Sequence, residues 1–511
     1  MNRRKFLQAG ATGALTGPDV LADIRDKFLP SHSTLSERLS APVVYTQDEE
    51  RRRLLHIAIC EKSIHSCMRK QLVTNYLPGQ CTYNLGEYPC RTPWQIEDYD
   101  VQLLDKLKTN GIQLIQLHEE WNDSQRLYGA TKFTPLNPSG FRRFIDLAHQ
   151  RDMKVIVYAS SGFFERRDPD FRAEWARDQD LVELFYNYAR CSPASPGWRA
   201  YVLNHIFRLM DEYGIDGIYN DLGYIPLGGN PNKPAPDEVM AFSERADEDG
   251  VLGDLLAQIY AGVHRRGGIV KVHCGATDRP HSKLLVYDYL WVGEEIESGD
   301  SLREAVKDYP PYVVPCLDMS KARIENEEEL YLHSIPYLQF PLLVNGKPFT
   351  GERGLIPGIK YVPESEDFWT AHCRKIWNYY KEHPDGPFSY GWWDSVPGRP
   401  GAQQTHAKWL ALYAPMVGEG TWTWLQVDSS SLFRSSVPRQ VVVSVFANQE
   451  LYLVLANYSR SPIILETAAS YFSCIDTSAP AKSHVRLNAR SLSILRMDTS
   501  TLPATNPNSQ V

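Results

Sequence analysis

The chain has 511 residues, 43% of them hydrophobic and 23% charged, which is enough for a barrel-sized domain with a large core plus an accessory module. Its formal net charge of −8 gives no support for nucleic-acid binding, which usually requires a basic face. No run of about 18 or more apolar residues occurs, so the sequence predicts no membrane span. It predicts no particular oligomeric state.

The first residues resemble an export signal. Arg3 and Arg4 precede Phe6, Leu7 and a stretch of small residues, which is similar to a twin-arginine signal. We therefore treat residues 1–40 as signal-like or disordered and expect a periplasmic or secreted protein. A cytoplasmic location stays open as the alternative.

From about residue 70 to 385, short apolar runs that favour strands alternate with longer segments of helical period, which indicates βα units and a parallel sheet. The predicted strands are 81–84, 112–117, 153–158, 215–219, 269–273, 287–291, 312–315 and 341–344. The clearest predicted helices are 103–108, 141–149, 199–213 and 252–264. About eight parallel strands with short links favour a (β/α)8 barrel over a doubly wound sheet. No dinucleotide-binding or phosphate-binding glycine motif follows a strand, and no cofactor is predicted.

The C-terminal part of the chain has a different pattern. Short β-rich runs separated by turn residues occur at 441–446, 451–456, 463–465, 471–475, 485–487 and 492–495. Their even spacing predicts an antiparallel β-sandwich. The predicted organisation is a barrel with an N-terminal extension over 41–425, a sandwich over 426–500 and a disordered tail over 501–511.

Active sites of such barrels gather at the carboxyl ends of the strands, so polar residues at these points are candidates. Asp221 is the strongest because it directly follows an apolar strand, where its side chain would point into the barrel mouth. Asp216, near the start of the same segment, is expected to have a structural role. The other candidates at strand ends are His118, Glu119, Glu120, Trp121, Asn220, His273, Glu294, Glu295 and Asp318.

The segment from Cys191 to Asp221 resembles the fourth βα unit of alpha-glycosidase-type barrels, which include the alpha-galactosidase clan and the alpha-amylase-like superfamily. It reads Cys191-Ser-Pro-Ala-Ser-Pro-Gly-Trp-Arg199, then a helix, then Tyr213-Gly-Ile-Asp-Gly-Ile-Tyr-Asn-Asp221. In such families the aspartate that ends this strand is the catalytic nucleophile, a role that the resemblance assigns to Asp221. The resemblance covers roughly residues 80–500, because these enzymes also carry a C-terminal β-sandwich.

The sequence departs from these families at the acid/base. The amylase pattern has a glutamate after the fifth strand, where residues 272–276 contain none, and the alpha-galactosidase pattern has an aspartate at the sixth. We select Glu294 because it follows the sixth strand and Gly293 permits a tight turn. Glu295 and Asp288 stay open as alternatives.

These observations predict a glycoside hydrolase that cleaves an oligo- or polysaccharide with two carboxylates. One carboxylate meets the positive charge that develops at the anomeric carbon, and one protonated carboxyl supplies a proton to the leaving oxygen. The resemblance favours retention through a covalent glycosyl intermediate on Asp221. The expected sugar contacts are His118, Glu119, Glu120, Trp121, Asn220, His273 and Asp318. The group after the second strand equally fits a hydrated rim, and His273 equally fits a hydrogen-bonded core histidine.

Two other classes of protein stay open. One is a non-catalytic carbohydrate-binding protein on a degenerate barrel, in which a catalytic carboxylate is missing or misplaced. The other is a metal-dependent barrel hydrolase, with zinc held by His118, Asp221, His273 and Asp318. Such barrels generally carry H-x-H on the first strand, and residues 81–84 do not.

Overall fold

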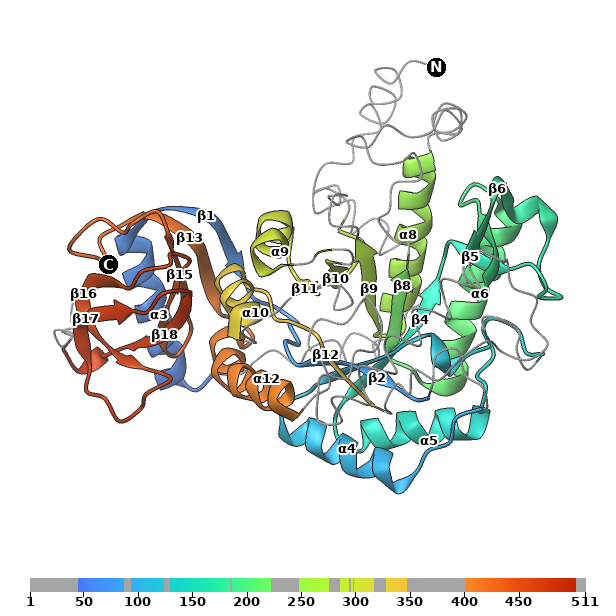
Figure 1. Cartoon of the computed structure of the whole chain (residues 1–511), viewed down its shortest axis with the longest axis horizontal. Coiled ribbons are helices and arrows are strands. Elements are labelled where there is room, and N and C mark those ends of the chain that lie inside the picture. The colour runs from blue at the N-terminus through green and yellow to red at the C-terminus, as the bar shows by residue number, and fades with distance from the viewer. Residues whose placement is uncertain are drawn as a thin grey trace, which may run out of the picture. The chain divides into compact units, whose positions relative to one another are not determined.

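The computed structural model describes residues 45–86, 93–123, 129–183, 186–221, 248–274, 285–293, 296, 298–316, 328–346 and 400–501. All of them lie in one compact unit, Val43–Val511. They form an eight-stranded parallel sheet, a seven-stranded antiparallel sheet and a small three-stranded sheet (Figure 1). Within these ranges, no helix combines the length and the apolar character that a membrane crossing requires.

The parallel sheet has the strand order of a (β/α)8 barrel, β11-β10-β9-β8-β4-β3-β2-β12. Its strands are β2 (Gln80–Asn84), β3 (Leu114–Leu117), β4 (Lys154–Ser160), β8 (Gly217–Asp221), β9 (Ile269–Cys274), β10 (Tyr289–Val292), β11 (Val313–Pro315) and β12 (Leu343–Gly346). From β2 to β11 each strand pairs with its neighbour in chain order, and the last strand, β12, pairs with the first, β2, so that β11 and β12 are the two ends of the described sheet. Every strand predicted for the barrel is present, so the predicted fold class is confirmed.

Local capping sets the ends of the helices that connect these strands. They are α4 (Asp98–Thr109), α5 (Pro138–His149), α6 (Pro196–Tyr213), α8 (Glu248–His264), α9 (Gly299–Val306), α10 (Glu328–Leu332) and α12 (Pro400–Tyr413). Asn137 and Ser195 cap α5 and α6 by accepting from main-chain N–H groups of the first turn, and each is followed by a proline. Gly214 ends α6 at φ 72°, a conformation that glycine adopts without steric cost. Short 3₁₀ helices are η1 (Glu119–Trp121), η2 (Ala173–Trp175), η3 (Ile335–Tyr337), η4 (Ala414–Val417) and η5 (Thr499–Thr501).

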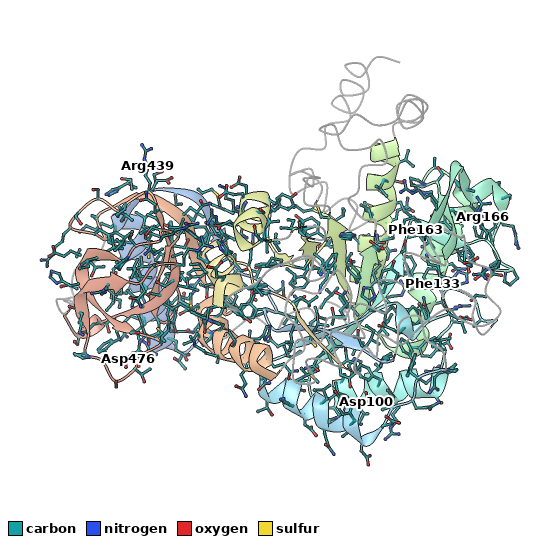
Figure 2. The ribbon with its side chains drawn as sticks, in the orientation of Figure 1. Asp100, Phe133, Phe163, Arg166, Arg439 and Asp476 are labelled. Atoms are coloured by element: carbon teal, nitrogen blue, oxygen red, sulfur yellow. The ribbon has the colours of Figure 1, made fainter. Side chains whose placement is uncertain are left out.

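A small antiparallel sheet is inserted between β4 and α6. Its strands are β5 (Phe163–Glu165), β6 (Ala176–Glu183) and β7 (Tyr186–Cys191), in the order β5-β7-β6. Lys132, which is buried, donates from Nζ to the main-chain oxygen of Ser160 at 2.7 Å and also to that of Phe163. Phe133 and Phe163 lie on this side of the molecule (Figure 2). The loop after β3 is thereby fixed against the end of β4.

The C-terminal sheet includes a strand from the other end of the sequence. Its strands are β1 (Ile64–Leu72), β13 (Trp422–Ser430), β14 (Val441–Ala447), β15 (Leu451–Asn457), β16 (Ile463–Ser473), β17 (Lys482–Leu487) and β18 (Ser491–Met497), and helix α3 (Gln47–Ser63) precedes β1. The order is β1-β13-β14-β15-β18-β16-β17, with antiparallel pairs throughout. β1 pairs with β13 from Ile64 opposite Ser430 to Leu72 opposite Trp422. The sequence analysis had placed β1 in the N-terminal extension of the barrel and did not anticipate this pairing.

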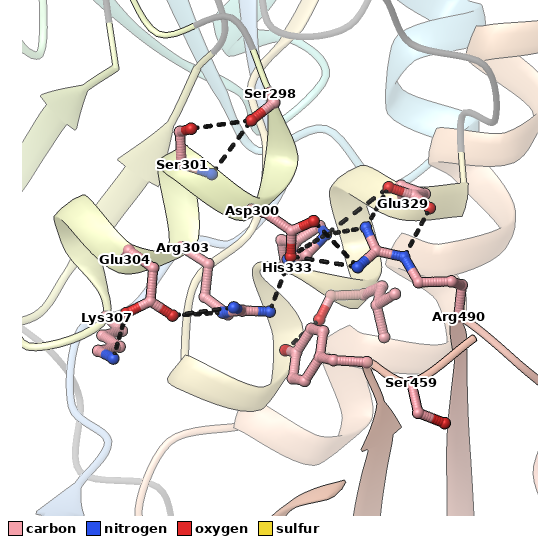
Figure 3. A network of polar contacts seen from close by, with 12 residues as sticks. Ser298, Asp300, Ser301, Arg303, Glu304, Lys307, Glu329, His333, Ser459 and Arg490 are labelled. Carbon is pink, nitrogen blue, oxygen red and sulfur yellow. Dashed lines mark hydrogen bonds and ion pairs between the residues drawn. The ribbon is translucent and has the colours of Figure 1, made fainter. Parts of the chain in front are cut away.

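One arginine connects this β domain to two helices of the barrel (Figure 3). Arg490, between β17 and β18, donates to both carboxylate oxygens of Glu329 in α10, at 3.1 and 2.8 Å. Its Nη1 also lies 3.0 Å from Asp300 Oδ2 in α9. Between these groups the imidazole of His333 is fully buried, and burial lowers its pKa to about 4. Arg490 thus links the β domain to the barrel helices α9 and α10.

Candidate active site

A hydrogen bond across the parallel sheet identifies its concave face. Lys271 in β9 donates to Gln116 Oε1 in β3 at 2.8 Å, although β8 and β4 lie between these two strands. Only side chains inside a curved sheet can meet in this way, and both are buried. Burial lowers the pKa of Lys271 to about 7. Because side chains alternate along a strand, His273 shares this inner face with Lys271.

The carboxylate of Asp221 is held by two side chains at the carboxyl ends of three adjacent strands. Tyr158 of β4 donates from its hydroxyl to Asp221 Oδ2 at 2.6 Å. Nδ1 of His273, in β9, lies 2.8 Å from Asp221 Oδ1. An ionised carboxylate only accepts hydrogen bonds, so the proton of this pair belongs on Nδ1. The two donors fix the orientation of Asp221 and stabilise its ionised form, while its side chain remains 20% exposed.

Aromatic rings surround this carboxylate. The ring of His118 lies 5.3 Å from that of Tyr158 and 6.5 Å from that of Tyr219. Trp291 of β10 contacts His273 edge to face at 4.8 Å and Tyr219 at 5.8 Å. The inner face of the barrel therefore presents one partly exposed carboxylate within a wall of rings, which suits a ligand with both apolar faces and polar groups.

Three of the predicted sugar contacts are buried, and two of them support this arrangement from positions within the core. Trp121 is fully buried and donates from Nε1 to the main-chain oxygen of Tyr158 at 2.9 Å. Asn220 is also fully buried, and its Oδ1 accepts from the main-chain N–H of Ser161 at 3.0 Å. Glu120 is buried, and its main-chain oxygen accepts from Trp94 Nε1 at 2.8 Å. Trp121 and Asn220 hold β4 and the loop after it, and so position Tyr158.

Asp216 and Asp288 lie at the opposite edge of the sheet from Asp221. Asp216 accepts from the main-chain N–H of Val155 at 2.8 Å, where β4 begins, which agrees with its expected structural role. Asp288 accepts from the N–H of Val270 at 2.8 Å, where β9 begins. The structure therefore does not bring Asp288 together with Asp221. Asp288 was an alternative acid/base because the alpha-galactosidase pattern has an aspartate at the sixth strand, but here this aspartate precedes β10 and binds the start of β9.

The remaining candidates fall outside the described residues. These are Glu294, Glu295 and Asp318, together with the side chain of Glu119. Gly293, which precedes the two glutamates, has a φ of 129°, and a Cβ at this position would lie 2.0 Å from the main-chain oxygen of Cys316. Only glycine fits there, as the expected turn after β10 requires.

The metal-site hypothesis receives no geometric support from the part of the chain that the structure describes. No group of three or more His, Cys, Asp or Glu side chains lies close enough together there to hold a metal ion. His118, Asp221 and His273 are described, whereas Asp318 is not.

Two residues at the site were not identified from the sequence. Tyr158 and Trp291 were treated only as strand residues. Strand alternation could have identified them. Trp291 is the register partner of His273. Ser160 is the register partner of Asp221, and Tyr158 lies two residues before Ser160, on the same face of β4. That signal becomes usable only once the pairing of the strands is known.

Solved structures resemble the chain in fold. No protein-family model and no curated protein matches it. Isomaltulose synthase PalI from Klebsiella sp. LX3 aligns with a TM-score of 0.51 at 12% identity, covering 83% of this chain and 100% of that chain. An inactive double mutant of the trehalulose synthase MutB aligns with a TM-score of 0.52 at 11% identity, covering 83% and 100%. MutB from Pseudomonas mesoacidophila MX-45 aligns with a TM-score of 0.50 at 11% identity, covering 83% and 99%.

Proposed function

We propose that the chain is a glycoside hydrolase of the retaining type, with Asp221 as the nucleophile. The observation that carries this proposal is the pair of hydrogen bonds from Tyr158 and His273 to the two oxygens of Asp221. They orient a partly exposed carboxylate at the end of a barrel where active sites form. The fold that the chain shares with isomaltulose and trehalulose synthases supports a sugar as the substrate.

The chemistry assigned to Asp221 is attack on the anomeric carbon. Its carboxylate oxygen forms the bond to this carbon while the bond to the leaving oxygen breaks, and water later releases the sugar from the resulting ester. Because both donors to Asp221 are side chains fixed within the barrel, the carboxylate does not have to reorient during the reaction. Glu294 is our choice for the acid that protonates the leaving oxygen, with Glu295 as its alternative. Asp288 is not retained, because its carboxylate is bound to the start of β9.

Substrate contacts are assigned to the rings around Asp221. His118 is our candidate for the ring on which the apolar side of a sugar stacks, His273 holds the nucleophile, and Tyr219, which is only 3% exposed, packs beside His118. Glu119, Glu120 and Asp318 remain candidates for hydroxyl contacts. Because the indole N–H of Trp121 already donates to the main-chain oxygen of Tyr158, its role is to hold Tyr158 rather than to contact the sugar.

The test is a panel of 4-nitrophenyl glycosides and polysaccharides, assayed with the parent protein and with the Asp221→Asn and Glu294→Gln variants. We expect each substitution to lower kcat by at least about 10²-fold, the usual scale for loss of a carboxylate that acts in catalysis. Asp216→Asn is the matched control, since it removes the same charge from the same strand segment at the other edge of the sheet. Near-normal turnover in Asp221→Asn would reject the proposal. Sugar binding without any turnover in the parent protein would instead indicate a carbohydrate-binding protein.

A further inference from the structure

Trp291 occupies a position in the barrel wall that no step of the proposed reaction uses. It is a residue of β10, it is only 3% exposed, and it is the register partner of His273. Its indole contacts His273 at 67° and Tyr219 at 68°, both edge to face. The residue is therefore fixed beside the histidine that binds Asp221.

The indole N–H of Trp291 differs from those of three other buried tryptophans of the barrel. Trp94, Trp121 and Trp198 donate to main-chain oxygens at 2.8, 2.9 and 2.9 Å. Nε1 of Trp291 is buried as well, but among the residues that the structure describes it has no hydrogen-bond acceptor. The described part of the chain thus satisfies three of these buried donors with main-chain oxygens and leaves the fourth, beside His273, without an acceptor.

An unsatisfied buried donor has an energetic cost that the fold must offset. Burying such a group without a partner costs about 1–3 kcal/mol, and native proteins leave few of them. Replacing Trp291 by phenylalanine would keep an aromatic ring and remove the donor, but it would also remove part of the buried ring system. An acceptor supplied by a ligand would satisfy the N–H and recover this cost on binding.

We propose that Trp291 is a specificity-determining residue, whose indole N–H donates a hydrogen bond to an oxygen of the sugar bound at Asp221. This inference rests on the proposed function. A buried donor of this kind accepts a substrate that places an oxygen against it and disfavours the analogue that lacks the oxygen, because the donor is then left unpaired. The ligand class is a hexose that presents a hydroxyl or ring oxygen to β10.

The first test compares Trp291→Phe with Trp121→Phe. Both substitutions remove an indole N–H from a buried tryptophan of the barrel, but only that of Trp121 has an acceptor within the protein. Both variants lose the same part of a buried side chain, so in urea unfolding we expect the midpoint to fall for both, but clearly less for Trp291→Phe, which loses no hydrogen bond within the described protein. An equal fall for both variants would overturn the proposal, because the N–H of Trp291 would then have a partner in the free protein. This test does not require any catalytic activity.

The second test measures binding to the Asp221→Asn protein, so that turnover does not enter. The probes are 4-nitrophenyl α-D-glucopyranoside and 4-nitrophenyl α-D-galactopyranoside, followed by calorimetry, together with the monodeoxy analogues of whichever binds more tightly. We expect Trp291→Phe to weaken binding about 5- to 10-fold, the scale of one hydrogen bond between neutral groups. One deoxy analogue should bind the Asp221→Asn protein more weakly than the complete sugar does, by a similar factor. Adding Trp291→Phe should abolish this difference in affinity.

The two proposals fail in different ways. Turnover without any effect of Trp291→Phe on affinity or on deoxy discrimination would overturn the role of Trp291 and leave the glycosidase proposal standing. Binding with the expected deoxy pattern, but no turnover in the parent protein, would overturn the hydrolase and retain the role of Trp291. Failure of both glycosides to bind would overturn the assignment of a hexose to this position.

Discussion

The two edges of the parallel sheet use the same pair of residue types in different ways. At the amino edge, Nε2 of His149 lies 2.7 Å from Oδ2 of Asp216, and Nε2 of His264 lies 3.0 Å from Oδ2 of Asp288. Each of these aspartates also accepts a main-chain N–H from the start of a neighbouring strand. At the carboxyl edge, His273 lies 2.8 Å from Asp221, whose other oxygen is bound by the hydroxyl of Tyr158.

The amino-edge pairs repeat one structural pattern. His149 is the last residue of α5 and His264 the last of α8, and each of these helices leads into the strand whose N–H the paired aspartate accepts. Because the same arrangement occurs at two positions, we assign it a structural role: each pair connects the end of a helix to the strand that follows it. At the carboxyl edge, Tyr158 and His273, which bind the two oxygens of Asp221, are side chains from within the barrel. A His–Asp pair alone therefore does not distinguish a candidate active site from a structural support. The distinguishing feature is the further partner of the aspartate, which is a main-chain N–H of a neighbouring strand at the amino edge and the hydroxyl of Tyr158 at the carboxyl edge.

Removing the histidine at each edge should separate the two roles most clearly. We expect His273→Phe to lower kcat/KM by about 10- to 100-fold, because a hydrogen bond to a charged group is worth about 1.5–3 kcal/mol. His264→Phe should leave kcat/KM within about twofold of the parent value. Steady-state kinetics on the best 4-nitrophenyl glycoside measures both. Equal losses in the two variants would remove the distinction between the edges.

For stability we expect the opposite order: the aspartates at the amino edge should contribute more to the free energy of unfolding than Asp221 does. We expect Asp288→Ala to lower the free energy of unfolding by about 1–3 kcal/mol, since the N–H of Val270 loses its acceptor. Asp216→Ala should have a similar effect through Val155, and kcat per folded molecule should stay unchanged in both variants. Urea unfolding with an unchanged m-value is the measurement. A larger loss of stability in Asp221→Ala than in either would contradict the comparison.

Tyr158→Phe tests the hydrogen bond to Asp221 at the carboxyl edge. It deletes the hydroxyl that donates to Asp221 but retains the main-chain oxygen that accepts from Trp121. We expect kcat/KM to fall about 10-fold, the effect of losing one hydrogen bond to a charged group at the lower end of its range, about 1.5 kcal/mol. The melting temperature should change little. A large fall in melting temperature would instead assign Tyr158 to the support of the fold.

The smallest expected effect is a pH dependence at the amino edge. The hydrogen bond to Asp216 raises the pKa of His149 above its usual 6.5. The folded protein therefore binds this proton more tightly than the unfolded chain. The stabilisation is fully present below about pH 6.5 and is lost as pH rises through the raised pKa.

Urea midpoints measured between about pH 5.5 and 8.5 should show this loss in the parent protein and a smaller one in His149→Gln. His149 is partly exposed, so the difference between the two curves will be modest. A variant curve parallel to that of the parent would show that the pair does not contribute to stability.

The strands of the barrel and the position of Asp221 were predictable because they depend on local patterns. Apolar runs bounded by Asn110 and Gly111, or by Gly267 and Gly268, indicate strands whatever the rest of the chain does. The order of residues then places Asp221 at the end of its strand and Asp216 near the start.

Other features were decided only by tertiary structure. The partner of β1 is β13, which lies 350 residues or more away in the sequence, and no local pattern identifies it. The distinct roles of Asp288 and Asp221, the donation from Tyr158 and the unpaired N–H of Trp291 depend on which strands lie side by side and on the direction in which each side chain leaves its strand. A sequence determines by itself the period of its own apolar residues. The partner of a polar side chain is chosen by neighbours that only the folded topology supplies.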